Sequence, residues 1–179
     1  MQRLFVALSP PVAIGDALLD LQEGVAGARW SDADNLHLTL RFVGEVGPHT
    51  LRDLATALAD VRFDPFALTL AGVGHFAGKG RSTAIWAGVQ PSAELDLLQM
   101  RVEMACRRAG LPPETRRFAP HVTLAWLNSG SAQIGGWLAR HGTLRLPAWP
   151  VAHMALYESD LTPNGPVYSE LCRFPATAA

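Results

Sequence analysis

Two short segments in separate halves of this chain share one pattern. Residues 37–40 read His-Leu-Thr-Leu and residues 121–124 read His-Val-Thr-Leu, each inside an apolar run. Successive side chains of a β-strand point to opposite sides, so this spacing predicts a strand with one buried and one open face. The pattern therefore predicts two strands that each carry a histidine and a threonine on the open face.

The same alternation predicts where the following side chains point. In the first strand we expect Arg41 on the open face, whereas Phe42 packs inward. In the second strand Trp126 is expected to pack inward as well. Histidine titrates near neutral pH, so two histidines facing one cleft can serve as a general acid and a general base. The pair predicts chemistry that needs two proton transfers.

A third formal match, residues 141–144 (His-Gly-Thr-Leu), has a different context. Gly142 follows the helical-looking stretch 136–140, and a glycine there is more typical of a helix end than of a strand centre. His141 is therefore predicted at the end of a helix and outside the functional pair.

Helical and strand patterns alternate along the chain, and the order strand, helix, motif strand, helix, strand recurs once. We expect helices at 12–25, 48–59, 92–108 and 132–140. Further strands are expected at 3–8, 36–43, 63–70, 82–89, 143–146, 151–158 and 167–174, with a glycine-rich loop before residue 82.

This order predicts an α+β fold that is bilobal and duplicated. We expect two sheets with outer helices around a central cleft, related by a pseudo-twofold axis because the order of elements recurs. The sheets should be mostly antiparallel, because several connections are too short for parallel crossovers. Residues 1–179 would form a single domain of two intertwined lobes, each supplying one motif, 37–40 or 121–124.

Composition limits the possible partners. The 179 residues are 49% hydrophobic, enough for one sizeable core, and the formal net charge of −1 argues against broad electrostatic capture of duplex nucleic acid. Without an apolar run long enough to cross a bilayer, the protein is expected to be cytoplasmic, with no membrane contact and no obligate protein partner. Cys106 and Cys172 lack metal spacing and are predicted to be reduced.

The segments around both motifs, together with the two ends of the chain, resemble the two-histidine phosphoesterases. Within these, the chain is most similar to the bacterial and archaeal RNA 2',3'-cyclic phosphodiesterases once called 2'-5' RNA ligases. The resemblance covers nearly the whole chain. The segments that carry it are Arg-Leu-Phe-Val-Ala-Leu at 3–8, Asn-Leu-His-Leu-Thr-Leu-Arg-Phe-Val-Gly-Glu-Val at 35–46, Ile-Trp-Ala-Gly-Val at 85–89, Phe-Ala-Pro-His-Val-Thr-Leu-Ala at 118–125, and Leu-Tyr-Glu-Ser, Gly-Pro-Val-Tyr and Phe-Pro at 156–159, 165–168 and 174–175.

The resemblance implies hydrolysis of an RNA 2',3'-cyclic phosphate end, or of a small cyclic nucleotide, to a 2'-phosphomonoester. His37 would be the acid that protonates the departing 3' oxygen, and His121 the base that deprotonates the attacking water. Thr39 and Thr123 would donate hydrogen bonds to the non-bridging phosphate oxygens. No metal or cofactor is implied.

One departure from the family pattern concerns positive charge. Members commonly carry a basic residue where this chain has Trp126, and often another where it has Ala119. The guanidinium fork suits phosphate oxygens, so Arg41, Arg116 or Arg117 is expected to supply the missing charge. The residues that we expect to stack on RNA bases are Phe118, Tyr157, Tyr168 and His75.

Other functions compete with hydrolysis at this stage. Reversible 2'-5' ligation, or a cyclic phosphodiesterase acting on a nucleotide metabolite, would use the same fold and residues. A non-catalytic RNA-end-binding protein would use the same cleft without turnover. A zinc enzyme is disfavoured, because neither motif brings a second histidine or a carboxylate at ligand spacing.

Overall fold

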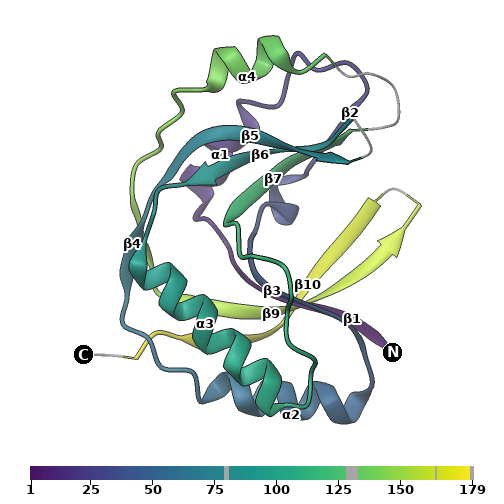
Figure 1. Ribbon diagram of the computed structural model, residues 1–179, viewed down its shortest axis with the longest axis vertical. Helices are drawn as coiled ribbons and strands as arrows, with labels where there is room; N and C mark the ends of the chain where they lie inside the picture. The colour runs from purple at the N-terminus through teal and green to yellow at the C-terminus, as the bar shows by residue number, and fades with distance from the viewer. Residues whose placement is uncertain (79–80, 128–132, 164, 178–179) are drawn as a thin grey trace.

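A computed structural model gives the fold, and it describes residues 1–78, 81–127, 133–163 and 165–177 (Figure 1). Within these residues the chain forms four α-helices, one eight-stranded sheet and one two-stranded sheet. All strand pairings are antiparallel, so the predicted α+β class with antiparallel sheets is confirmed.

The large sheet runs in the order β10-β9-β1-β3-β7-β6-β5, with β2 also paired to β7. We call its two sides the first and the second half. The first half consists of β1 (Gln2–Leu8), β3 (Leu38–Val46), β9 (His153–Thr162) and β10 (Gly165–Pro175). The second half consists of β2 (Ala28–Trp30), β5 (Leu70–Gly78), β6 (Arg81–Val89) and β7 (His121–Leu127).

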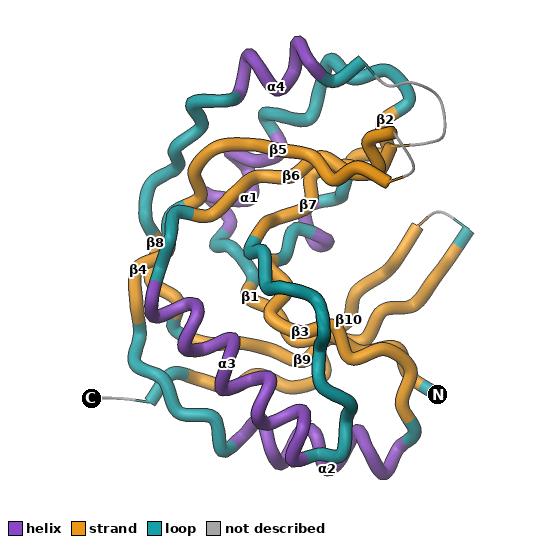
Figure 2. The backbone as a smooth tube through the Cα atoms, viewed as in Figure 1, coloured by secondary structure: helices purple, strands orange, loops and turns teal. Residues whose placement is uncertain are grey.

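Helices cover the outer side of both halves, as the backbone trace shows (Figure 2). In the first half, α2 (Pro48–Ala59) packs against α3 (Ala93–Arg108), and α3 contacts β3. In the second half, α4 (Gly135–His141) contacts β5. None of the helices in the described ranges combines the length and apolarity needed to cross a bilayer.

Shorter elements complete the fold. The helix α1 (Val12–Leu19) buries two apolar side chains in the core, and a 3-10 turn, η1 (Ala33–Asn35), precedes the first motif. The small sheet consists of β4 (Phe66–Leu68) and β8 (Trp149–Val151). It lies where the chain passes between the two halves, as the left side of Figure 2 shows.

Local sequence explains the two long helices. Pro48 occupies the first turn of α2, where its missing N–H removes no hydrogen bond. The Ser92 hydroxyl caps α3 by accepting a hydrogen bond from the Leu95 N–H at 3.1 Å. Acidic residues in the first turn of α3 and arginines in its last turn complement the helix dipole.

A single residue pair joins the two halves of the large sheet. Leu38 of β3 lies opposite Val122 of β7, and it is the one register pair between these strands. Both side chains are almost completely buried, at 1% and 0% exposure. They are the second residues of the two motifs, so this junction sets the motifs side by side at the centre of the molecule.

The first motif strand contains a β-bulge directly after the motif threonine. Thr39 lies opposite Ala7, and Arg41 lies opposite Val6, so Leu40 is an extra residue without a partner on β1. A bulge reverses the alternation of side chains beyond it. Phe42 consequently faces the cleft at 37% exposure and does not pack inward as predicted, whereas Arg41 lines the cavity but turns its guanidinium towards Glu103 of α3.

The second motif strand repeats this bulge at the equivalent position. Thr123 lies opposite Trp86 and Ala125 opposite Ile85, which leaves Leu124 as the extra residue. Trp126 therefore faces the cleft at 45% exposure and does not pack inward as predicted. The repeated bulge is a local likeness between the halves, whereas the pseudo-twofold axis stays a prediction.

Several element boundaries differ from those predicted. The helix α1 ends at Leu19 instead of residue 25, and the expected strand at 143–146 is reduced to one bridge between Ala71 and Arg145. The predicted glycine-rich loop is strand β5, where a Cβ on Gly74 would lie 2.3 Å from the Trp86 ring. Glycine there makes room for an aromatic ring. The prediction that His141 ends a helix is confirmed.

We predict that Leu38→Ala destabilises the fold, because it opens a cavity at the junction between the halves. The free energy of unfolding should fall by roughly 2–5 kcal/mol, measured by urea denaturation. The matched control is Leu161→Ala, since Leu161 is 69% exposed, and it should change stability by less than about 0.5 kcal/mol. Equal losses in the two variants would contradict the role given to this junction.

Candidate active site

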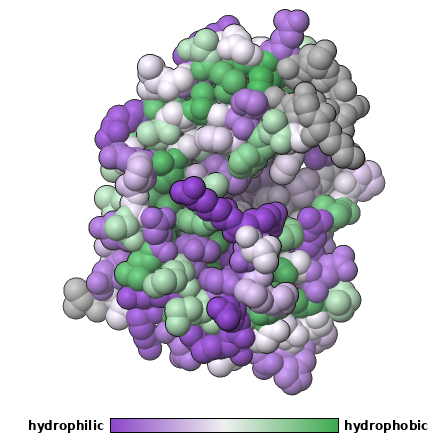
Figure 3. Space-filling view, viewed as in Figure 1, coloured by the Kyte–Doolittle hydropathy of each residue, from purple (hydrophilic) through white to green (hydrophobic). Residues whose placement is uncertain are grey.

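The two motifs meet in a cavity of about 700 Å³ between the halves of the sheet. His37, Thr39, His121 and Thr123 all line it. Figure 3 shows the surface hollowed between the upper and lower parts of the molecule, with hydrophilic side chains at the rim. The structure thus brings together the four residues that the sequence singled out.

Aromatic rings surround His37. Its ring centroid lies 4.5 Å from that of Tyr157, 5.5 Å from Tyr168 and 5.9 Å from Phe5, in edge-on contacts. Burial lowers the pKa of His37, because the charged form loses hydration. The backbone of Asn35 acts in the opposite direction and raises the pKa of His37. The Nδ1 atom of His37 is buried, and no described residue lies within hydrogen-bonding geometry of it.

His121 has a similar setting but a better-defined tautomer. Its Nδ1 atom lies 2.6 Å from the Ala119 carbonyl oxygen, so Nδ1 carries a proton that it donates to this carbonyl. In the neutral ring, Nε2 is then the atom free to accept a proton. Phe76 and Trp86 flank the ring at 4.7 and 6.0 Å, and burial lowers the pKa of this histidine too.

Arg41 lies at the edge of the cavity, but other groups occupy its guanidinium. This side chain is 7% exposed, and its Nε donates to Glu103 at 2.6 Å. Its remaining nitrogens donate to the carbonyls of Phe42 and Pro112, and Glu114 lies 3.6 Å away. The interpretation of Arg41 as a free cleft cation is therefore corrected: it ties β3 to α3 and to the loop before the second motif.

Arg116 and Arg117 both line the cavity from that loop. Two hydrogen bonds of 2.9 and 3.2 Å pair Arg116 with Glu114, and they hold the pKa of this carboxyl at about 2. Arg116 is thus largely neutralised by its neighbour. Arg117 has no ion pair in the described part of the chain, and Phe118 beside it is half-buried in the cavity wall.

Two of the predicted base platforms lie elsewhere. His75 is absent from the cavity lining, whereas the next residue on β5, Phe76, is part of it. Tyr157 is buried behind His37, stacked on Phe5 at 5.3 Å, and its hydroxyl lies 2.6 Å from that of Ser9. Because its ring face is covered, Tyr157 supports the histidine and is not placed to stack on a base.

Several cavity residues are not predicted by the sequence, and four of them carry a ring or a charge that the site can use: Phe42, Trp126, Arg3 and Arg29. Simple alternation predicts the wrong face for Phe42 and Trp126 because a bulge precedes each of them, and Arg3 and Arg29 lie outside both motif strands. Arg29 lies directly opposite Trp126 across β2 and β7. Only knowledge of the strand pairing could have revealed these four residues, since alternation within one strand gives no such signal.

The family model described as LigT like Phosphoesterase matches residues 8–86 and 88–168. An RNA 2',3'-cyclic phosphodiesterase of Archaeoglobus fulgidus is 30% identical over 172 residues, covering 94% of this chain and 97% of the relative. One from Aeropyrum pernix is 33% identical over 149 residues, covering 82% and 85%. The chain belongs to the LigT-like phosphoesterase family.

Solved structures agree with this assignment. The crystal structure of Escherichia coli LigT complexed with 3'-AMP has a TM-score of 0.80 and 28% identity, covering 99% of each chain. A Thermus thermophilus protein has a TM-score of 0.80 and 26% identity, covering 97% of each chain. These neighbours share the fold over its full length.

We predict that Arg41→Ala destabilises the protein, because it leaves the carboxylates of Glu103 and Glu114 without their buried cation. The free energy of unfolding should fall by about 3 kcal/mol. Arg116→Ala is the matched control: its side chain is 76% exposed, so a loss below about 1 kcal/mol is expected. Urea denaturation of both variants measures the difference, and a neutral Arg41→Ala would refute the structural role.

Proposed function

We propose that this chain hydrolyses the 2',3'-cyclic phosphate at an RNA end to a 2'-phosphomonoester without a metal ion. The observation that carries the proposal is the meeting of two His-Thr pairs, from separate segments, in one cavity. The relatives named RNA 2',3'-cyclic phosphodiesterase support it. In this proposal residues 1–179 act as a single domain of two intertwined lobes, each supplying one motif.

The surroundings of the two histidines support different roles for them. The carboxylates of Asp34 and Glu170 act on His37 and raise its pKa against the effect of burial, whereas no carboxylate of the described residues shifts the pKa of His121. His37 is therefore the better holder of a proton and His121 the better acceptor. The Ala119 carbonyl, bonded to Nδ1 of His121, leaves Nε2 to act as the base.

The reaction follows from these roles. His121 removes a proton from water as the water oxygen attacks phosphorus, and the bond between phosphorus and the 3' oxygen breaks. His37 gives its proton to that 3' oxygen, so the phosphate stays on the 2' position. Thr39 and Thr123 donate hydrogen bonds to the non-bridging oxygens, holding the phosphorus in line and stabilising its developing charge.

A direct test uses an oligonucleotide with a 2',3'-cyclic phosphate end, incubated with the protein and a chelator. We expect a 2'-phosphate product, identified by chromatography against both phosphate isomers. His37→Ala and His121→Ala should each lower kcat by about 10² to 10⁴-fold.

The matched control for both variants is His49→Ala, because the His49 side chain is 83% exposed on α2. It should leave kcat unchanged. Absence of hydrolysis by the wild-type protein, or hydrolysis that survives both motif substitutions, would overturn the proposal.

The pH dependence of kcat/KM gives a second prediction. The profile should be bell-shaped, because activity falls at low pH as His121 becomes protonated and at high pH as His37 loses its proton. Glu170→Gln removes a carboxylate that raises the pKa of His37, so the alkaline limb should move to lower pH while the acid limb stays. Glu23→Gln, at an exposed loop position, is the control. A flat profile between about pH 5 and 9 is the contrary result.

A further inference from the structure

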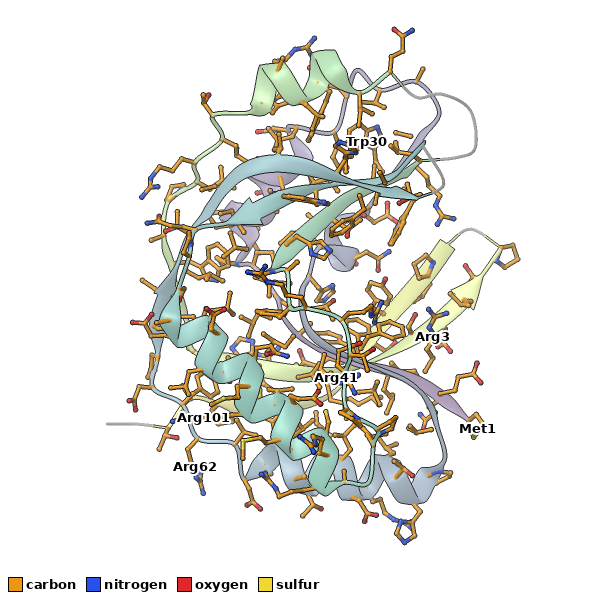
Figure 4. All side chains as sticks on the ribbon, viewed as in Figure 1. Met1, Arg3, Trp30, Arg41, Arg62 and Arg101 are labelled. Atoms are coloured by element: carbon orange, nitrogen blue, oxygen red, sulfur yellow. The ribbon has the colours of Figure 1, made fainter. Side chains whose placement is uncertain are left out.

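Two arginines outside both motifs reach the cavity from opposite halves of the sheet. Arg3 comes from β1 and Arg29 from β2, and both line the cavity. Figure 4 shows Arg3 in the lower part of the molecule beside the β9–β10 hairpin. Arg29 reaches the same hairpin, since its Nη1 atom lies 3.9 Å from the position of a Cβ on Gly165.

Tyr168 of this hairpin lines the same cavity as the two arginines and His37. Its ring is 5.5 Å from that of His37. Burial raises the pKa of the Tyr168 phenol, and the charges of Arg3 and Arg29 both act against that rise. Both guanidinium groups are therefore within electrostatic reach of a ring that touches a motif histidine.

These two arginines are uncommitted, unlike Arg41 and Arg116. Neither Arg3 nor Arg29 makes a hydrogen bond or an ion pair with any residue that the structure describes. Two unpaired cations that line one cavity favour an anionic ligand. The reacting phosphate lies with the motif residues in the proposed function, so these arginines are suited to a second phosphate of the same RNA chain.

An exposed aromatic ring accompanies each of these cations. The Arg3 guanidinium lies 5.0 Å from the centroid of the Phe42 ring. Arg29 stands opposite Trp126, and the row continues across the sheet through the small Ala84 to Phe76. A ring beside a cation suits a nucleotide, whose base can stack while its phosphate is paired.

We propose that Arg3 and Arg29 form a second anion site, which binds the phosphodiester that joins the terminal nucleotide to the rest of the RNA. The site would make the enzyme select RNA ends over free cyclic mononucleotides, which lack this phosphodiester. It also accounts for Trp126 in the place of a family cation, because Arg29 carries the charge one strand away. The inference rests on the proposed function.

The test compares two substrates of the full-length protein: a nucleoside 2',3'-cyclic phosphate and a dinucleotide ending in the same cyclic phosphate. Wild type should have the higher kcat/KM on the dinucleotide, and added salt should reduce this preference. Arg29→Gln should lower the ratio of the two kcat/KM values about tenfold, the loss expected for one charged hydrogen bond. Arg3→Gln should act in the same direction, and Arg29→Lys should retain part of the preference.

Two controls separate the phosphodiester contact from other effects. Arg52→Gln, on the exposed side of α2, should leave the ratio unchanged. Wild type should show no preference for a dinucleotide with a neutral methylphosphonate linkage over the cyclic mononucleotide. Arg29→Gln should not change kcat/KM on this neutral dinucleotide, as a double-mutant cycle requires.

Equal kcat/KM of wild type on both substrates, or an equal loss on both in Arg29→Gln, would overturn the second site while leaving the proposed function intact. Failure to hydrolyse either substrate would instead refute the proposed function.

Discussion

The pairing of Leu38 with Val122 holds the functional part of this protein together. It joins β3 to β7 through one pair of buried side chains, and these side chains are the centres of the two motifs. Two segments from separate halves of the chain thereby share one cavity. Neighbouring side chains of a strand point to opposite sides, so each histidine and threonine faces the cavity because the residues next to it pack into the core. Burial of the apolar residues therefore exposes the polar ones to the cavity.

Nearly identical motifs become chemically different through their surroundings. Aromatic rings pack against both histidines, and burial lowers the pKa of both. The carboxylates of Asp34 and Glu170 raise the pKa of His37, and the Nδ1 atom of His121 lies 2.6 Å from the Ala119 carbonyl oxygen. A pair of equal histidines would compete for one proton. This difference in environment is what supports an acid and a base.

The arginines of the cavity divide into structural and available charges. Arg41 and Arg116 are paired with glutamates and stabilise the loop before the second motif, whereas Arg3, Arg29 and Arg117 have no acidic partner among the described residues. The 14 arginines and one lysine of the chain are therefore not interchangeable as sources of positive charge for a ligand. A guanidinium already bonded to a carboxylate has little attraction left for a phosphate, so the unpaired ones determine where an anionic chain can lie.

Alternation within each strand correctly predicts the two motif strands and the cavity-facing side chains of His37, Thr39, His121 and Thr123. The glycine after His141 correctly predicts that this histidine ends a helix. These are local properties, since they depend on side chains a few positions apart. The faces of Phe42 and Trp126 could not be predicted in this way, because a bulge is defined by how many residues of one strand lie opposite those of its partner. Which arginines are free was decided by contacts between distant segments, such as Arg41 with Glu103, and these exist only in the folded chain.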